Sequence, residues 1–240
     1  MRVFHCRQQS DLWYSLRRGR ITCSRLGDVL APPITRKSSR GEAGTEALAR
    51  EKYRKDLVAE RLTLHGVSHY VTRAMEEGVE REPFARMIYE AETQQVVEQV
   101  GFVLHPEWDW FGGSADGLCG DDGGVELKCP TEGVHLSYIQ NPDLLIEEYK
   151  WQSIGNLLCA GREWWDLASF NPYFPDDLKL LRVRMHRSEY LAEIDRIGEE
   201  VPKFDAEVEA EIAALGQPPT TWAIPKENSE ISTEIPVVSS

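Results

Sequence analysis

The sequence has 240 residues, of which 41% are hydrophobic and 28% are charged, a balance typical of one soluble globular domain. No apolar run is long enough to span a membrane, and the N-terminus lacks the apolar core of a signal peptide, so we expect a cytoplasmic protein. The five scattered cysteines include no C-x-x-C pair, which argues against a disulfide framework and against a zinc or iron–sulfur cluster.

The net charge of −13 argues at first against a nucleic-acid partner, but the charge is unevenly distributed. Residues 1–50 carry ten Lys/Arg and four Asp/Glu, a net +6, whereas residues 188–240 carry three and twelve, a net −9. An acidic protein can bind DNA if its basic groups line one surface, because the local field decides binding.

The N-terminal half is predicted to be mostly helical. Asp11–Arg18 reads as a short helix, and a second helix is expected near Thr22, with Thr22 or Ser24 as its N-cap. Residues 31–45 have the composition of a loop, and apolar spacing predicts a helix over Thr45–Leu64. A further helix is expected from about Met75 to Val100, either kinked or restarted at Pro83.

The hydrophobic period then changes to that of strands. Strands are predicted at Phe102–His105, Trp110–Cys119, Val125–Cys129 and Glu163–Phe170 and around Leu181–Met185, with a tight turn at residues 120–124. Helices are expected from about Pro142 to Ala160 and over residues 189–215. These elements predict a single α/β domain over residues 1–216, with a central mixed sheet flanked by helices, and a mobile tail over residues 217–240.

The segment most informative about chemistry is G-G-S-A-D-G-L-C at residues 112–119, followed by V-E-L-K-C-P at residues 125–130. Glu126 and Lys128 are two apart on a predicted strand, so both point to one face, about 6–7 Å apart. A hairpin can bring Asp116 beside Glu126, with the Leu127 carbonyl between them. Two carboxylates and a carbonyl suit Mg²⁺, and the lysine suits phosphodiester hydrolysis by positioning water or stabilising charge.

An E-x-K pattern also occurs in exposed strands, where alternating charges form a solvated face. Here the neighbours Val125, Leu127 and Cys129 are apolar and β-prone, so an unpaired charge among them would be costly. The pattern therefore favours a bound partner or a metal.

Four motifs in order resemble the phage lambda exonuclease family of the PD-(D/E)xK nuclease superfamily. The first is S-A-D-G-L-C with V-E-L-K-C-P, in which Ala115 replaces the usual Pro. The others are W-x-x-L-R-x-G-x-I-T-x-S from Trp13, G-x-x-x-E at Gly78–Glu82 followed by Ala85 and Arg86, and Y-x-x-Q at Tyr149–Gln152. Ile154 stands where the family has a second Gln, which puts any role of that Gln in doubt.

The resemblance implies roles for individual residues. Asp116, Glu126 and the Leu127 carbonyl would bind Mg²⁺, for which Mn²⁺ would substitute, Glu82 would bind the metal directly or through water, and Lys128 would be catalytic beside Gln152. Arg17, Ser24 and Ser114 would form the pocket for the 5′ phosphate, although without the resemblance a solvated helix charge is the favoured interpretation of Arg17. Met75 would be either an apolar wedge at the strand end or ordinary core. Arg36, Lys37 and Arg40 would reach the DNA or form a solvated basic loop.

The resemblance also implies an activity and an assembly. The expected enzyme digests one strand of duplex DNA from its 5′ end to mononucleotides and leaves a 3′ overhang. A ring-shaped homotrimer and a protein that anneals single strands are the implied partners. Two other classes remain open: a restriction-like endonuclease or Holliday-junction resolvase that lacks the 5′-phosphate pocket, and a non-catalytic DNA-binding module.

Overall fold

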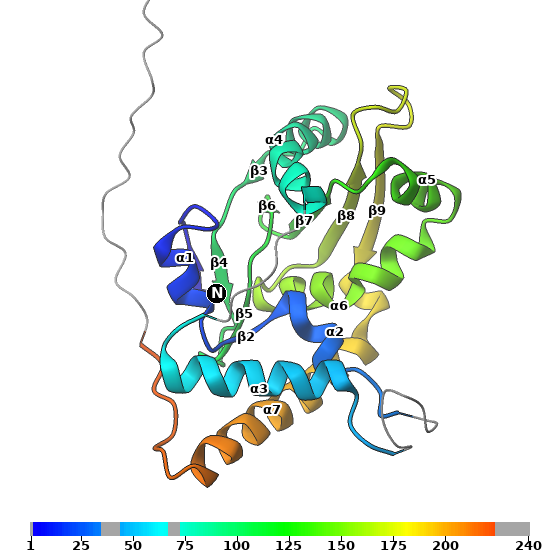
Figure 1. Cartoon of the computed structure of the whole chain (residues 1–240). Helices are drawn as coiled ribbons and strands as arrows, with labels where there is room; N and C mark the ends of the chain where they lie inside the picture. The colour runs from blue at the N-terminus through cyan, green and yellow to red at the C-terminus, as the bar shows by residue number, and fades with distance from the viewer. Residues whose placement is uncertain (1, 35–43, 67–72, 224–240) are drawn as a thin grey trace, which may run out of the picture.

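The computed structural model describes residues 2–34, 44–66 and 73–223, except for the side chains at 73–76 and 79. Its strands form two sheets (Figure 1). The larger sheet has the order β3 (Val97–Glu98), β6 (Gly117–Cys119), β7 (Gly123–Lys128), β8 (Trp164–Phe170) and β9 (Leu180–His186). It is mixed, since β7 and β8 run parallel while the other neighbours run antiparallel.

The smaller sheet has the order β1 (Arg2–Phe4), β4 (Phe102–Leu104), β5 (Phe111–Gly113) and β2 (Ile21–Thr22). The prediction of a single strand over Trp110–Cys119 is wrong, because the chain leaves one sheet after Gly113 and enters the other at Gly117. The intervening residues 114–116 therefore join the two sheets. The sequence also gave no signal for the short strands β1 and β3.

The described helices and 3₁₀ turns fill the connections between the strands. They are α1 (Asp11–Arg17), η1 (Cys23–Arg25), α2 (Leu26–Val29), α3 (Leu48–Thr63), α4 (Arg73–Thr93), α5 (Glu132–Gln140), α6 (Asp143–Cys159), η2 (Arg187–Glu189) and α7 (Leu191–Ala214). Helices α1, α3, α6 and α7 confirm the helices predicted at these positions. None of the helices described is long and apolar enough to cross a membrane.

Three helix predictions need correction. Helix α4 runs through Pro83 and ends at Thr93, because Gln94 adopts a left-handed backbone with φ 56°. After Thr22 the chain forms only a 3₁₀ turn and one helical turn, and neither has a side-chain cap. Helix α5 was not predicted, since Gly133 and mixed polarity hide its period.

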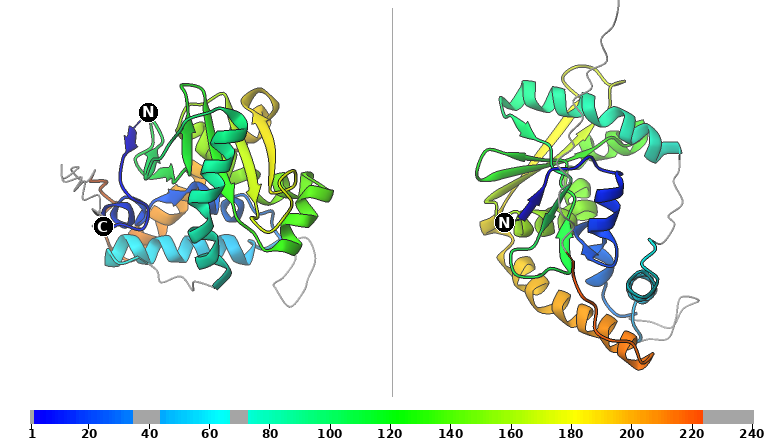
Figure 2. Two further views of the ribbon diagram at one scale, coloured as in Figure 1. Left: turned by 90° about the horizontal axis from the view of Figure 1, so that it is seen from above. Right: turned by 90° about the vertical axis from the view of Figure 1, so that its left-hand side faces the viewer.

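Helices cover both faces of the larger sheet, with α4 on one face and α6 on the other (Figure 2). Successive side chains of β8 point alternately to the two faces of the larger sheet. Trp165 and Leu167 pack in the core that includes α6, whereas Trp164 and Ala168 pack with Tyr89 of α4. The sheet is therefore buried on both sides, and its polar groups must find partners.

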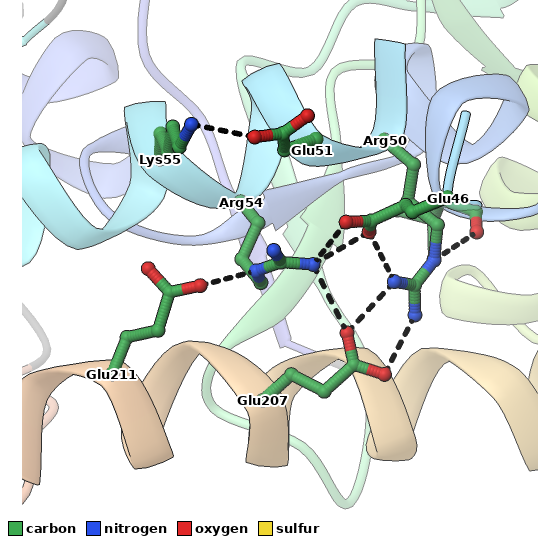
Figure 3. A network of polar contacts seen from close by, with 8 residues as sticks. Glu46, Arg50, Glu51, Arg54, Lys55, Glu207 and Glu211 are labelled. Carbon is green, nitrogen blue, oxygen red and sulfur yellow. Dashed lines mark hydrogen bonds and ion pairs between the residues drawn. The ribbon is translucent and has the colours of Figure 1, made fainter. Parts of the chain in front are cut away.

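Arginines of α3 join that helix to α7 (Figure 3). Arg50 forms a two-pronged pair with Glu207, at 2.7 and 2.9 Å, and Arg54 pairs with Glu211. Glu46 accepts hydrogen bonds from both arginines. Such a network fixes helix positions better than isolated surface pairs do.

Residues 217–223 pack against the domain, although the sequence predicts a mobile tail from 217. The Thr220 amide donates to Glu209 at 3.0 Å, and Arg20 donates to the Ala223 carbonyl at 3.3 Å. The Trp222 ring lies 4.9 and 5.0 Å from the guanidinium groups of Arg20 and Arg61. The rest of the predicted tail, 224–240, lies outside the described residues.

Candidate active site

Asp116 is held against β7 by the backbone. The register that pairs Gly117 with Val125 places Asp116 level with Glu126, and the Asp116 carboxylate accepts the Leu127 amide at 2.7 Å. The predicted hairpin therefore brings Asp116 beside the E-x-K strand. Asp116 lies at the start of β6, in the link between the sheets, whereas the sequence suggested the end of a long strand.

Glu126 and Lys128 point toward α6. The Lys128 ammonium donates to Glu126 Oε1 at 2.8 Å and contacts Gln152 Oε1 at 3.4 Å. Gln152 donates to the same Glu126 oxygen, and Asn156, one turn further along α6, donates to Glu126 Oε2 at 3.1 Å. The ammonium also lies 4.5 Å from the centre of the Tyr149 ring. One face of α6 thus fixes both side chains of the E-x-K pair.

The carboxylates of this cluster are crowded and buried. Burial raises the pKa of Glu126, and repulsion from Asp116 raises it further. Burial likewise raises the pKa values of Asp116 and Glu82. Burial opposes the charge on Lys128, but the nearby carboxylates outweigh it and raise the pKa of its ammonium. Lys128 is therefore held as a cation, whereas ionisation of all three carboxylates together is unfavourable without a further positive charge.

This donor set fits a hard divalent cation. Among the described residues, no group of three or more His, Cys, Asp or Glu side chains is arranged to hold a metal ion. The available set is the carboxylates of Asp116 and Glu126 with the Leu127 carbonyl. One or two carboxylates and a carbonyl leave positions for water and phosphate oxygens, as Mg²⁺ prefers. A bound cation would favour the ionised forms of these crowded carboxylates.

Ser114, in the link between the sheets, forms a second polar centre with two residues of α1. Ser114 Oγ accepts hydrogen bonds from Arg17, at 2.9 Å, and from the Trp13 indole, at 2.8 Å. The Arg17 guanidinium also lies 4.4 Å from the Trp13 ring centre. Helix α1 carries both donors and begins at Ser10, whose hydroxyl caps it. The predicted pair Arg17 and Ser114 is thus in contact.

Ser24 lines a hollow that Arg17 and Trp13 also line. A cavity of about 770 Å³ is lined by Arg17, Ser24, Trp13, Thr22 and Tyr53, among others. Ser24 is exposed, and its hydroxyl lies 3.3 Å from that of Thr22. Arginine and hydroxyl donors around one hollow suit an anion with several oxygens.

A second cleft, of about 900 Å³, lies beside Asp116. Asp116, Glu82 and Arg86 line it together with residues 5–10. Glu82 pairs with Arg86 at 3.3 Å, and Gln8 donates to the Ala115 carbonyl at 3.1 Å. Asp116 therefore lines this second cleft, whereas Ser114, two residues earlier, bonds Arg17 and Trp13, which line the first hollow.

Some predicted residues cannot be placed. Met75 lies in α4, but its side chain is outside the described part of the structure, and Arg36, Lys37 and Arg40 lie outside the described residues altogether. Conversely, Asn156 and the role of Trp13 were missed. Asn156 is four residues after Gln152 on one helix face, and that spacing could have indicated it.

The solved structures similar to this chain include exonucleases of the restriction-endonuclease-like fold. The chain belongs to the YqaJ-like viral recombinase family, whose domain matches residues 12–163. The alkaline exonuclease LHK-Exo from Laribacter hongkongensis is 34% identical, with a TM-score of 0.72, over 86% of this chain and 96% of that one. Its complex with dAMP matches at 35% identity and a TM-score of 0.73, with the same coverage.

A phage-related exonuclease from Haemophilus somnus 129PT is 15% identical over 83% of this chain and 98% of its own, with a TM-score of 0.65, and shows the fold alone. No match was found among the curated proteins. The family and the LHK-Exo structures support a nuclease of the recombinase family.

Proposed function

We propose that the chain is a Mg²⁺-dependent exonuclease that digests one strand of double-stranded DNA from its 5′ end to mononucleotides and leaves a 3′ overhang. One observation carries the proposal: Ser114, bonded to Arg17, and Asp116, beside Glu126 and Lys128, are only two residues apart. Two residues of extended chain span about 6–7 Å. A terminal phosphate at Ser114 would therefore leave the next phosphate of the same strand near Asp116.

Asp116, Glu126 and the Leu127 carbonyl would hold Mg²⁺, which acidifies water and neutralises charge on phosphate oxygens when it is bound. Glu82 would contribute directly or through water. Lys128, a cation fixed by Glu126 and Gln152, would stabilise the charge that develops on the oxygens of the scissile phosphate. Gln152 and Asn156 would hold the Glu126 carboxylate in one orientation.

The products of this hydrolysis explain why digestion would proceed one nucleotide at a time. Water attacks the phosphorus, the bond from phosphorus to the 3′ oxygen breaks, and that oxygen takes a proton. The released nucleotide keeps its 5′ phosphate, and the shortened strand gains a new one. Each product end can therefore enter the pocket of Arg17, Ser24 and Ser114, so one cycle prepares the substrate of the next.

The proposed partners are a duplex DNA end, two further copies of the chain in a homotrimeric ring, and a protein that anneals the exposed single strand. The family resemblance supports these partners. A ring would suit a chain of net charge −13, because only the groups lining its channel need be basic.

The test uses a linear duplex with one 5′-phosphorylated end and a label on each strand, incubated with Mg²⁺ or with EDTA. We expect mononucleotides to leave progressively from the phosphorylated strand in Mg²⁺ alone. Lys128→Ala should abolish release, whereas Lys150→Ala, on α6 but without a described contact to Glu126, should not. Internal cuts, or equal cleavage of a circular duplex, would instead favour a restriction-like endonuclease or resolvase. Binding without any cleavage would favour a non-catalytic module.

A further inference from the structure

The cleft on the Asp116 side of the link contains an arginine with unused hydrogen-bonding capacity. Arg86 lies on α4, and its side chain is only 15% exposed. One terminal nitrogen contacts Glu82 at 3.3 Å, while the buried Nε has no partner among the described residues. A buried donor without a partner is costly, so a ligand that supplies an acceptor would stabilise it.

A second arginine on the same helix forms the same kind of ion pair, with a glutamate four residues earlier. That pair alone therefore does not explain why Arg86 lies in the cleft. Arg81 contacts Glu77, four residues earlier, at 3.2 Å, and its side chain is 18% exposed. Its guanidinium also lies 5.3 Å from the centre of the Tyr173 ring, and it does not line the cleft. Arg81 and Arg86 thus share helix, spacing and burial, but only Arg86 faces the candidate metal site.

The charges of the cleft suit an anion beside Arg86. When all three carboxylates of Asp116, Glu82 and the adjoining Glu126 are ionised, Lys128 and Arg86 leave one excess negative charge. A divalent cation would make the balance positive by one, and one phosphodiester would restore neutrality. Arg7, exposed at the rim of the same cleft, adds a further positive charge.

We propose that Arg86 binds a phosphate of the DNA strand on the 3′ side of the scissile bond, so that the cleft it lines receives the strand that remains. The inference rests on the proposed function, and in particular on the 5′ phosphate lying at Arg17 and Ser114. The strand would then pass Asp116 and continue into the cleft. Gln8 fixes the cleft wall to this path, since it donates to the carbonyl of Ala115, between the two centres.

The experiment measures release of the first nucleotide in a single turnover, from duplexes whose digested strand carries one neutral methylphosphonate. The neutral group is placed at the third or the fourth phosphate, counting the 5′-terminal one as first, so the scissile phosphate stays intact. On the unmodified strand, Arg86→Met should slow release at least tenfold. On the strand whose neutral group replaces the contacted phosphate, the release rates of Arg86→Met and of the wild type should differ less than twofold.

Three variants distinguish a phosphate contact of Arg86 from a structural role. Arg81→Met removes the matched pair on the same helix and should leave release and its dependence on the neutral group unchanged. Arg86→Lys keeps the charge and should recover part of the rate, with the same position dependence. Arg7→Gln changes only an exposed side chain, so it should fold normally and cause a smaller loss at the same or the next phosphate.

A binding measurement in EDTA gives a readout independent of cleavage. The slope of log K against log salt concentration should fall by about 0.7 to 0.9 in Arg86→Met, as expected for the loss of one phosphate contact. Arg81→Met should keep the wild-type slope.

Failure of the inference differs from failure of the proposed function. If the wild type does not release 5′ nucleotides from the unmodified strand, the proposed function is wrong. If it does, but Arg86→Met loses the same factor on every substrate and keeps the salt slope, Arg86 is structural and the inference is overturned.

Discussion

Arg17 donates a hydrogen bond of 2.9 Å to the hydroxyl of Ser114, across 97 positions of sequence. The contact joins helix α1 to the link between the two sheets. Because the Trp13 indole donates to the same oxygen, one hydroxyl orients two side chains of the proposed 5′-phosphate pocket.

Ser114→Ala should therefore weaken recognition of the 5′ phosphate. Loss of hydrogen bonds worth about 1–2 kcal/mol predicts a fall of roughly 5- to 30-fold in first-nucleotide release from phosphorylated ends. Ends with a 5′ hydroxyl should be affected much less. Ser15→Ala is the control, since that hydroxyl bonds only the Leu12 carbonyl of its own helix. An equal loss on both kinds of end would contradict a phosphate pocket at Ser114.

Asn156 should be needed to orient Glu126. Asn156→Leu keeps the approximate volume but removes the donor to Glu126 Oε2, a bond to a charged group worth about 1.5–3 kcal/mol. We expect release to slow at least tenfold in saturating Mg²⁺ and the protein to be less stable in urea. The matched change on α6 is Ser153→Ala, which removes a buried hydroxyl without a described partner and should alter neither quantity. Full activity of Asn156→Leu would argue against an orienting role.

Gly113 should not tolerate even one methyl group. A Cβ there would lie 1.9 Å from Asn156 Oδ1 and 2.7 Å from Cys23 Sγ. Gly113→Ala should cost about 1–3 kcal/mol of stability and, by displacing Asn156, should lower activity as Asn156→Leu does. Gly133→Ala, in helix α5 with open space around it, should instead be neutral or stabilising by about 0.5–1 kcal/mol. Urea titrations of the two variants test the contrast.

His105 should make stability depend on pH. Burial, together with the smaller effect of the nearby Arg2 charge, lowers its pKa to about 4. Its Nδ1 accepts the amides of Glu107 and Trp108, both at 3.3 Å, as only an unprotonated nitrogen can. The unfolded imidazole has a pKa of about 6.5, so unfolding takes up a proton. The contribution of neutral His105 to the free energy of unfolding is complete above pH 6.5 and is lost as the pH falls toward 4. The loss amounts to at most about 3 kcal/mol.

The measurement is the free energy of unfolding in urea from pH 7.5 to 4, for the wild type and for His105→Asn. The asparagine oxygen can accept the same amides but does not titrate in this range, so the variant should lose less stability on acidification. Identical pH profiles would contradict the assignment.

Local patterns in the sequence were enough to predict much of the fold and half of the site. Helical spacing predicted α3 and α7, and alternation predicted β9, because side-chain direction repeats within a few residues. The same rule placed Glu126 and Lys128 on one face of a strand. Short elements such as β1, β3 and α5 were missed, since too few residues carry their period.

Only the tertiary structure decided the contacts between segments that are far apart in the sequence, because no local hydrophobic period encodes them. It split the expected strand at Ser114, so that one link joins two sheets and holds Ser114 and Asp116 two residues apart. It brought Asn156 to Glu126 and Trp13 to Ser114, and it packed Trp222 against Arg20 and Arg61. The physical reason is that these buried polar groups must find partners wherever the packing of α1, α4 and α6 on the sheets places them.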